Sequence, residues 1–232
     1  MIPSYAHCEP LLMSDPDYAN LVNIVQKQYP RACIQMIDRY RNPVLEGLFE
    51  EKKQQLAAKG WGQEYQVFHG TRREHVASIC EHGFQPNRAS RMAFGVGIYF
   101  SKTFALSWSY TDTIKGFSDD PLSYIFVCRI LPGNTCHGTA DTPPTRGFDS
   151  SCNSTTAENA CIFAIPEADQ MIPHYLIRFH KESESTYTTP VNETSLKDLA
   201  IEKMSLKELE QMNNRMLKRI PKKKTKKNLP LH

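Results

Sequence analysis

Hydrophobic and polar residues follow two different spacings along this chain. Apolar positions three and four residues apart share one helical face, and they predict helices at 14–30, at 43 to about 60, around 76–80 and at 102–110. Short apolar runs rich in β-branched and aromatic residues predict strands, and these runs cover 33–38, 65–68, 94–100, 124–131, 161–165 and 171–179. The pattern therefore predicts a domain in which helices and strands are mixed.

Two stretches lack either spacing. Residues 1–13 predict irregular structure, and residues 132–159 are rich in Gly, Pro, Ser, Thr and Asp, which predicts a long surface loop. A loop of more than about 15 residues without secondary structure of its own is often functional or disordered.

The composition fits one globular domain followed by a tail. A chain of 232 residues with 40% hydrophobic residues can form one sizeable core. No apolar run reaches the roughly 18 residues of a membrane span, and residues 1–5 show no secretory signal pattern. The seven Cys are an odd number and include no Cys-x-x-Cys pair, which predicts reduced thiols in the nucleus or the cytoplasm. The lack of a long apolar run predicts no membrane partner.

The positive charge is concentrated near the C-terminal end. The formal net charge is +3, yet residues 201–232 hold ten Lys and Arg against three Glu, which leaves −4 for residues 1–200. We predict that residues 1–181 form the main domain and that residues 182–232 form a polar linker, short helices and a basic tail. Such a tail is either a solvated, disordered end or a contact for nuclear import or nucleic acid.

The stretch from Tyr65 to Tyr110 carries the residues best suited to chemistry. His69 and Gly70 end one predicted strand, Tyr99 lies in the next, and Ser107 and Tyr110 stand three apart on a helical face. Together they offer an imidazole, a bare backbone group that a ligand can approach, a hydroxyl and two aromatic planes. This set suits a flat, amide-bearing ring attached to a sugar.

These motifs resemble a known family. The segments Phe68–His69–Gly70–Thr71 and Gly95–Val96–Gly97–Ile98–Tyr99–Phe100, followed by Ser107 and Tyr110, look like the NAD-binding core of poly(ADP-ribose) polymerase-type ADP-ribosyltransferases. Ten residues separate Tyr99 from Tyr110, which is the spacing of the diphtheria-toxin-like branch. The resemblance covers roughly residues 17–181.

The resemblance implies a fold and a set of roles. The expected fold is α+β, with two mainly antiparallel sheets around an NAD cleft and flanking helices. NAD is the expected substrate, and no metal is expected. The nicotinamide would stack between Tyr99 and Tyr110, and its amide would bind the Gly70 backbone and the Ser107 hydroxyl. His69 would bond the adenosine ribose, and Thr71 is the remaining NAD-binding residue that the motif implies.

The third catalytic position distinguishes subgroups of this family. Polymer-forming members carry a Glu there, and counting back eight residues from Gln170 places Ile162 at this position. The catalytic set is then His69, Tyr99 and Ile162. Because Ile cannot polarise an acceptor hydroxyl, the sequence resembles the mono-ADP-ribosylating subgroup, for which the expected acceptor is a protein or else a nucleic acid.

Each of these residues also has a purely structural interpretation. His69 could be a buried, hydrogen-bonded histidine, Tyr99 and Tyr110 could be core aromatics, and Ser107 could bond its own helix backbone. Two other functional classes also remain, namely a pseudoenzyme that binds partners or RNA and an RNA 2′-phosphotransferase of the same superfamily. Several cysteines and one histidine could suggest a metal site, but their spacing matches no compact zinc pattern: Cys128, Cys136, His137, Cys152 and Cys161.

Overall fold

The computed structural model describes residues 7–30, 32–88, 93–111 and 122–181, so the predicted helices and basic tail of 182–232 lie outside the described residues. The described strands are β1 (His7–Pro10), β2 (Ala32–Arg41), β3 (Tyr65–Thr71), β4 (Ile98–Ser101), β5 (Leu122–Ile130), β6 (Thr135–His137), β7 (Ser150–Cys152), β8 (Ile162–Ile165) and β9 (Met171–Lys181). The helices are α1 (Pro16–Gln28), α2 (Pro43–Ala57), α3 (Arg73–His82) and α4 (Phe104–Trp108), with short 3₁₀ turns at Pro86–Arg88 and Ala168–Gln170.

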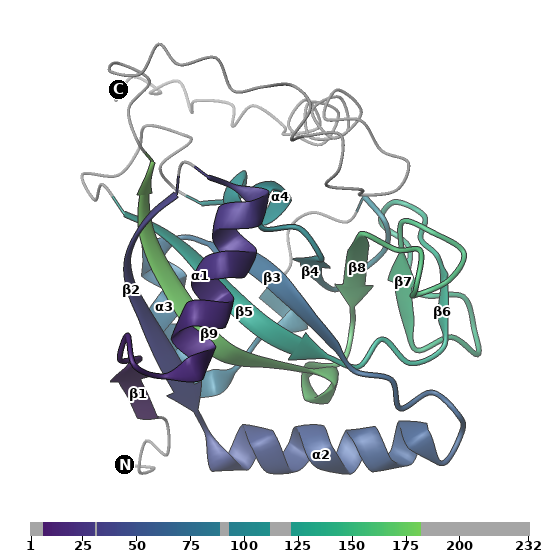
Figure 1. The fold of residues 1–232 in the computed structure, drawn as a ribbon. Coiled ribbons are helices and arrows are strands. Elements are labelled where there is room, and N and C mark those ends of the chain that lie inside the picture. Colours follow the sequence, from purple (N-terminus) through teal and green to yellow (C-terminus); the bar gives the residue numbers. More distant parts are fainter. Residues whose placement is uncertain (1–6, 31, 89–92, 112–121, 182–232) are drawn as a thin grey trace, which may run out of the picture. The chain divides into compact units, whose positions relative to one another are not determined.

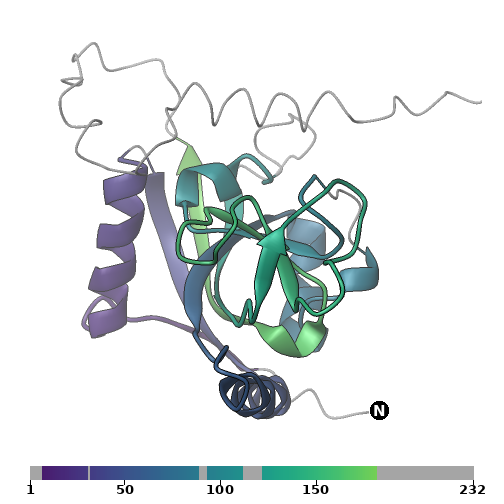
Figure 2. The same ribbon diagram turned by 90° about the vertical axis from the view of Figure 1, so that its right-hand side faces the viewer.

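The strands form one sheet in the order β1-β2-β9-β5-β3-β4-β8-β7-β6. Every described pairing is antiparallel except that of β6 with β7. The sheet is narrowest between β3 and β4, which are joined through the single pair Phe68–Ser101. The expected α+β class is confirmed, but the two expected sheets are one continuous sheet, because the Phe68–Ser101 pair joins the halves on either side of this junction (Figure 1, Figure 2).

Helices cover the larger half of the sheet on both faces. Alternate residues of a strand point to opposite faces, so Ile125 and Val127 of β5 pack with α1 and α4, whereas Phe126 packs in the cluster that contains Ile79 of α3. Leu21 belongs to the α1 side of this packing. The functional segments thus lie on a sheet that is packed on both faces.

The starts of α1 and α2 follow from local sequence signals. The Asp15 side chain accepts a hydrogen bond from the backbone N–H of Asp17, and Pro16 begins α1. The Asn42 side chain accepts from the N–H groups of Val44 and Leu45 in the same way. Side-chain caps of this kind satisfy backbone donors that the first helical turn leaves unpaired, so both predicted helix starts are confirmed.

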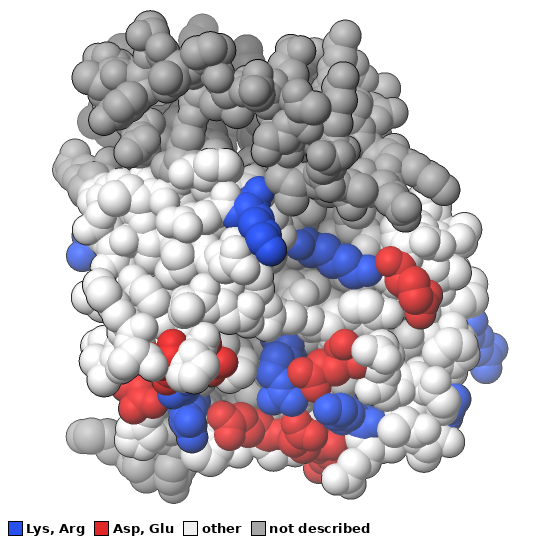
Figure 3. Space-filling view, in the orientation of Figure 1, with Lys and Arg blue, Asp and Glu red and all other residues white. Residues whose placement is uncertain are grey.

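A charged network fixes α2 to the sheet. Arg129 of β5 donates to the Glu64 carboxylate through Nε and Nη2, at 2.6 and 2.9 Å, and to Glu50 at 2.8 Å. Lys53 of α2 also donates to Glu64, at 2.8 Å. The hydrogen bonds from Arg129, and then those from Lys53, lower the pKa of Glu64 to about 2. Lys and Arg therefore stand beside Asp and Glu along the edge of the molecule where α2 lies (Figure 3).

Two stretches predicted to be irregular contain strands. β1 lies within residues 1–13, and β6 and β7 lie within the predicted loop 132–159. These strands have only three or four residues, and their sequences show no alternation of hydrophobic and polar residues. All residues of β1 are exposed, and β7 consists of Ser150, Ser151 and Cys152. Pairing with neighbouring strands holds them in the sheet, and a short local pattern does not reveal such pairing.

The predicted boundaries around the functional segment also need correction. The strand predicted to begin at Phe94 begins at Ile98, because Gly95 and Gly97 adopt φ values of 111° and 150°, which only glycine adopts readily. The strand predicted for 65–68 continues to Thr71 through pairing with β5. The helix predicted for 102–110 is limited to 104–108, since Thr103 is still extended.

Within the described residues, no helix is long and apolar enough to cross a membrane.

Candidate functional site

The junction between the two halves of the sheet opens beside Gly70. β3 pairs with β5 as far as Thr71, but its pairing with β4 is limited to Phe68 and Ser101. The Phe68 carbonyl accepts a hydrogen bond from the Ser107 hydroxyl of α4 at 3.0 Å. Because backbone groups two residues apart in a strand face the same side, the N–H and C=O of Gly70 point to the same side of β3 as the Phe68 carbonyl, beyond the last pair with β4.

The backbone of Gly70 lies so close to α4 that no residue with a side chain would fit at this position. A Cβ at this position would stand 1.7 Å from the carbonyl oxygen of Ser107 and 3.4 Å from the Cβ of Tyr110. Gly70 does not adopt a positive φ angle, so backbone conformation does not require glycine here. Glycine is required because a side chain would have no room. The sequence suggested room for a ligand here, and the structure shows in addition that α4 itself occupies the place of the missing side chain.

The Ser107 hydroxyl does not bond its own helix, so the structural alternative for this residue is wrong. It reaches across to β3, whereas the hydroxyl of Ser109 donates to the Leu106 carbonyl within its own turn. Ser107 thus ties α4 to the strand that carries His69 and Gly70.

His69 is oriented by the backbone of the neighbouring strand. Its Nδ1 lies 2.8 Å from the carbonyl oxygen of Tyr99, and its ring packs against Phe84 and Phe100 at centroid distances of 5.0 and 5.5 Å. Burial lowers the pKa of His69 to about 4, although the bond to the Tyr99 carbonyl opposes this effect. The imidazole is therefore neutral at pH 7. Since a carbonyl only accepts, the proton is on Nδ1 and Nε2 is an acceptor.

The Tyr99 hydroxyl closes the turn that precedes its own strand. It accepts from the backbone N–H of Phe94 and donates to the Gly95 carbonyl, both at 2.7 Å. Burial, and to a smaller extent the neighbouring Tyr110, raises the pKa of Tyr99, so the hydroxyl stays protonated. Tyr99 and Tyr110 are both partly exposed, and neither belongs to the hydrophobic clusters of the described residues, so they are not core aromatics.

A second loop holds this turn from outside. The Val96 N–H donates to the Thr142 carbonyl at 3.0 Å. A Cβ on Gly138 would stand 1.8 Å from the Phe94 carbonyl oxygen, and one on Gly95 would stand 2.7 Å from the Ser151 Oγ. The loop predicted for 132–159 therefore packs directly onto the turn that carries the Tyr99 hydroxyl bonds.

Ile162 lies on the same sheet face as Tyr99. It is paired with Ser101 of β4, and Ala164, two residues later, is paired with Tyr99. Ile162 is only 3% exposed but is outside the hydrophobic cluster that contains Phe163 on the opposite face. The structure thus places an aliphatic side chain, and no carboxylate, at the third position of the predicted set.

The predicted residues come from four elements that meet at the junction. His69, Gly70 and the buried Thr71 lie on β3, Tyr99 lies on β4, Ser107 lies on α4, Tyr110 follows α4, and Ile162 begins β8. One contact to this region is not predicted by the sequence: the Gln28 side chain of α1 accepts a hydrogen bond from the Phe104 N–H at 2.6 Å. A contact across 76 residues leaves no local signal in the sequence.

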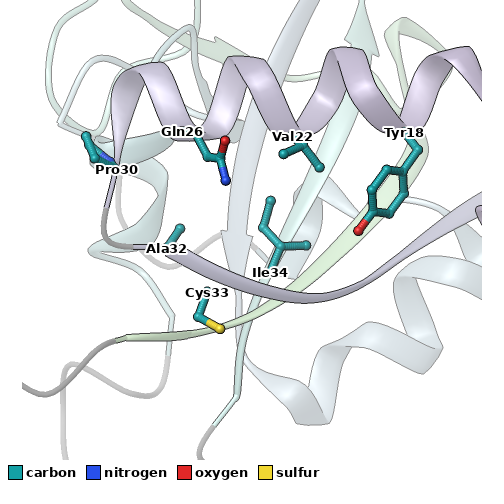
Figure 4. A pocket seen from close by; sticks show the side chains of 7 residues that line it. All are labelled: Tyr18, Val22, Gln26, Pro30, Ala32, Cys33 and Ile34. Carbon is teal, nitrogen blue, oxygen red and sulfur yellow. The ribbon is translucent and has the colours of Figure 1, made fainter. Parts of the chain in front are cut away.

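A groove of about 360 Å³ lies elsewhere, between α1 and β2 (Figure 4). It is lined by Tyr18, Val22, Gln26, Pro30, Ala32, Cys33 and Ile34. None of the predicted site residues lines this groove, so it is separate from the candidate site. In the described part of the chain, no three His, Cys, Asp or Glu residues are grouped as metal ligands.

Comparison with known proteins agrees with the geometry. The family model of the poly(ADP-ribose) polymerase catalytic domain matches residues 15–188. The human protein mono-ADP-ribosyltransferase PARP12 is 28% identical over 193 residues, which are 78% of this chain and 27% of that protein. Human PARP11, also named a protein mono-ADP-ribosyltransferase, is 32% identical over 199 residues, 74% of this chain and 58% of the relative.

A third relative, human protein mono-ADP-ribosyltransferase PARP14, is 30% identical over 187 residues, 74% of this chain and 10% of that protein. The chain thus spans between 10 and 58% of the length of these relatives. The family match covers most of the chain and includes every predicted site residue from His69 to Ile162. The chain belongs to the poly(ADP-ribose) polymerase catalytic domain family.

Proposed function

We propose that this protein is an NAD-dependent mono-ADP-ribosyltransferase, which transfers ADP-ribose to a protein acceptor and releases nicotinamide. The observation that carries the proposal is the end of the β3–β4 pairing at Phe68, beyond which Gly70 has no partner on β4 and lies directly against Ser107. Family membership and the names of the three relatives support the same reaction class.

The nicotinamide amide fits the groups around Gly70. A carboxamide both donates and accepts hydrogen bonds, and a strand residue beyond the end of its ladder offers one N–H and one C=O on the same side. The Ser107 hydroxyl donates to Phe68, and its oxygen lone pairs can accept from the amide. The rings of Tyr99 and Tyr110 then supply the two planes of the stack.

His69 is suited to hold a ribose hydroxyl. Its Nδ1 proton is used by the Tyr99 carbonyl, so Nε2 is an acceptor for a hydroxyl donor of the adenosine ribose. Because the pKa of His69 is about 4, this acceptor is present throughout the neutral range. The backbone bond also fixes the ring orientation before the substrate arrives, which reduces the cost of ordering it on binding.

The chemistry proposed for this site relies on positioning. The C–N bond between the ribose and nicotinamide breaks with its electron pair leaving on nicotinamide, and a nucleophile of the acceptor protein forms the new bond to the ribose carbon. Ile162 can neither take a proton nor polarise a hydroxyl, so the acceptor itself supplies the base that takes the proton from its nucleophile. Alignment of the reacting groups and electrostatic stabilisation then provide the catalysis, and one ADP-ribose is added per acceptor residue.

The deciding experiment is incubation of the full chain with isotopically labelled NAD and a protein extract, followed by mass spectrometry of the modified residues. We expect a mass increase of a single ADP-ribose on protein side chains. NAD binding without transfer would instead support a pseudoenzyme that acts as a binding protein, and failure to bind NAD would overturn the assignment.

We also propose that residues 182–232 act separately from the catalytic domain of 1–181, through nucleic-acid contact or nuclear import. The ten Lys and Arg of 201–232 support this idea. A chain ending after Glu182 should still fold and cleave NAD, and should lose nucleic-acid binding or nuclear accumulation. Nucleic-acid binding by the full chain should weaken steeply with added salt, and binding that is insensitive to salt would contradict this role.

A further inference from the structure

The helix that carries Ser107 is too short to be stable by itself. α4 contains five residues, whereas isolated helices shorter than about 12 residues are marginal in water. The backbone N–H groups of Phe104, the first residue of α4, and of the two residues before it are each bound by another group. Lys102 donates to the Cys161 carbonyl and Thr103 to the Ser101 hydroxyl, both at 2.9 Å, and Phe104 donates to the Gln28 carboxamide at 2.6 Å.

Of these three contacts, the one from Gln28 connects α4 to another helix. Gln28 is the last residue of α1, and Tyr29, which follows it, packs against Trp108 and Phe104 of α4 at centroid distances of 4.8 and 6.4 Å. The end of α1 therefore holds α4 by one hydrogen bond at its start and by aromatic packing along its length.

This contact lies one helical turn from the groups that face Gly70. Ser107 is three residues beyond Phe104, its N–H bonds the Thr103 carbonyl at 3.3 Å, and its own carbonyl fills the space beside Gly70. Phe104 is fully buried, so its N–H would have no water to replace Gln28. Loss of the Gln28 oxygen would leave this donor unpaired and would free the first turn of α4 to shift.

We propose that Gln28 is a positioning residue of the nicotinamide pocket, which acts through α4 on Ser107 and on the Gly70 contact. The inference rests on the proposed function, since it assigns a role within that site. Gln28 is outside the sequence motif and contacts the start of α4, three residues before Ser107. Its effect should therefore appear in nicotinamide and NAD binding more than in the rate of the bound complex.

The test compares two substitutions in the full chain. Gln28→Met removes the acceptor at similar length, and Gln28→Glu keeps an acceptor oxygen in the same place. Gln26→Met, two residues earlier on α1 and in the lining of the groove, is the matched control. Calorimetry with nicotinamide gives its Kd, steady-state assays with NAD give KM and kcat separately, and thermal unfolding reports the fold.

We expect Gln28→Met to raise the Kd of nicotinamide and the KM for NAD about fivefold, which matches the loss of one hydrogen bond of about 1 kcal/mol. The value of kcat should change little, because the contact acts on ground state and transition state alike. Gln28→Glu and Gln26→Met should bind nicotinamide like the parent. If Gln28→Met lacks cooperative unfolding, Gln28→Asn, which withdraws the oxygen by one methylene, takes its place with the same expectation.

Unchanged nicotinamide binding by a folded Gln28→Met protein overturns the inference and leaves the proposed function intact. Equal weakening by Gln28→Met and Gln28→Glu also overturns it, because the acceptor oxygen would then not be the cause. A parent chain that binds neither nicotinamide nor NAD overturns the proposed function, and this inference with it.

Discussion

The carbonyl oxygen of Ser107 occupies the place where any side chain on residue 70 would begin, 1.7 Å from the position of a Cβ. Gly70→Ala must therefore push α4 away from β3 and displace the Ser107 hydroxyl from Phe68. Overpacking of this kind costs about 1 to 3 kcal/mol of unfolding free energy. We expect a lower unfolding temperature together with loss of NAD-dependent labelling, measured by thermal unfolding and by transfer assays.

Gly47→Ala is a matched control for this substitution. Gly47 lies in α2, and a Cβ there would meet nothing within 4 Å. Alanine in a helix interior is favoured over glycine by about 0.5 to 1 kcal/mol, so this variant should be at least as stable as the parent and fully active. A Gly70→Ala protein with parental stability and activity would show that α4 is not seated against β3 in this way.

Three substitutions separate the roles of His69 and Tyr99. His69→Ala removes the Nε2 acceptor that we propose for the ribose and should abolish labelling, with the protein still folded. Tyr99→Phe keeps the aromatic plane but removes the hydroxyl that bonds Phe94 and Gly95, so it should lower the free energy of unfolding by about 1 to 2 kcal/mol and retain part of the activity. Tyr99→Ala removes the plane as well and should abolish labelling. Labelling at the parental level by His69→Ala or Tyr99→Ala would place the site elsewhere.

The protonation of His69 gives a prediction for the dependence of stability on pH. In the unfolded chain the imidazole takes up its proton near pH 6.5, and in the folded chain its pKa is about 4. Between these values the unfolded chain binds more protons, so the free energy of unfolding falls as the pH drops from 6.5 to about 4. His69→Gln should reduce this slope, measured by denaturant unfolding at several pH values. An unchanged slope would show that the ring is protonated alike in both states.

Local signals account for what the sequence could predict. Asn42 and Pro43 specify the start of α2, and the apolar run of β5 identifies a central strand, because caps and buried strands depend on neighbouring residues. The site motif was also visible, since its residues lie close together along β3, β4 and α4. The contact between Gln28 and Phe104 joins residues far apart in the chain, and no local pattern encodes which side chain caps a helix from outside.

The same distinction explains the errors near the site. The apolar run predicts a strand that includes Gly95 and Gly97, although their positive φ angles make a turn that the Tyr99 hydroxyl closes. Ser150 and Ser151 looked like loop residues, yet they are buried in β7. Small and polar residues can be placed in a strand only when their partners across the sheet are known.

The ion pair of Glu64 with Arg129 and Lys53 should contribute to stability in a defined pH range. The carboxyl titrates near 4.5 when unfolded and near 2 when folded, so its contribution is present above pH 4.5 and is lost as the pH falls toward 2. Glu64→Gln should lower the free energy of unfolding by about 1 to 2 kcal/mol at pH 7. The control Glu167→Gln changes an exposed carboxylate and should have no effect. Equal stability of the Glu64→Gln and Glu167→Gln proteins at pH 7 would rule out this contribution.

Ile162 leads to the most direct test of the reaction product. Its aliphatic side chain is 3% exposed and lies on the Tyr99 face, beside the buried hydroxyls of Ser101 and Thr103, which bond each other at 3.0 Å. No described carboxylate replaces it in the β4–β8 pairing. The product should therefore carry one ADP-ribose per acceptor residue, even with excess NAD and long incubation. Phosphodiesterase digestion and mass spectrometry of the products measure this directly.

Ile162→Glu should not convert the protein into a polymerase. A carboxylate at this buried position loses its hydration and has no described cation beside it on β4, so its pKa should rise and the fold should be destabilised by about 1 to 3 kcal/mol. The isosteric change Ile162→Leu should preserve both stability and single addition, since volume-conserving apolar exchanges cost less than about 1.5 kcal/mol. Chains of ADP-ribose made by the parent would contradict the role of Ile162. Chains made only by Ile162→Glu would show that this one side chain limits elongation, and that the rest of the site already binds a second ADP-ribose as acceptor.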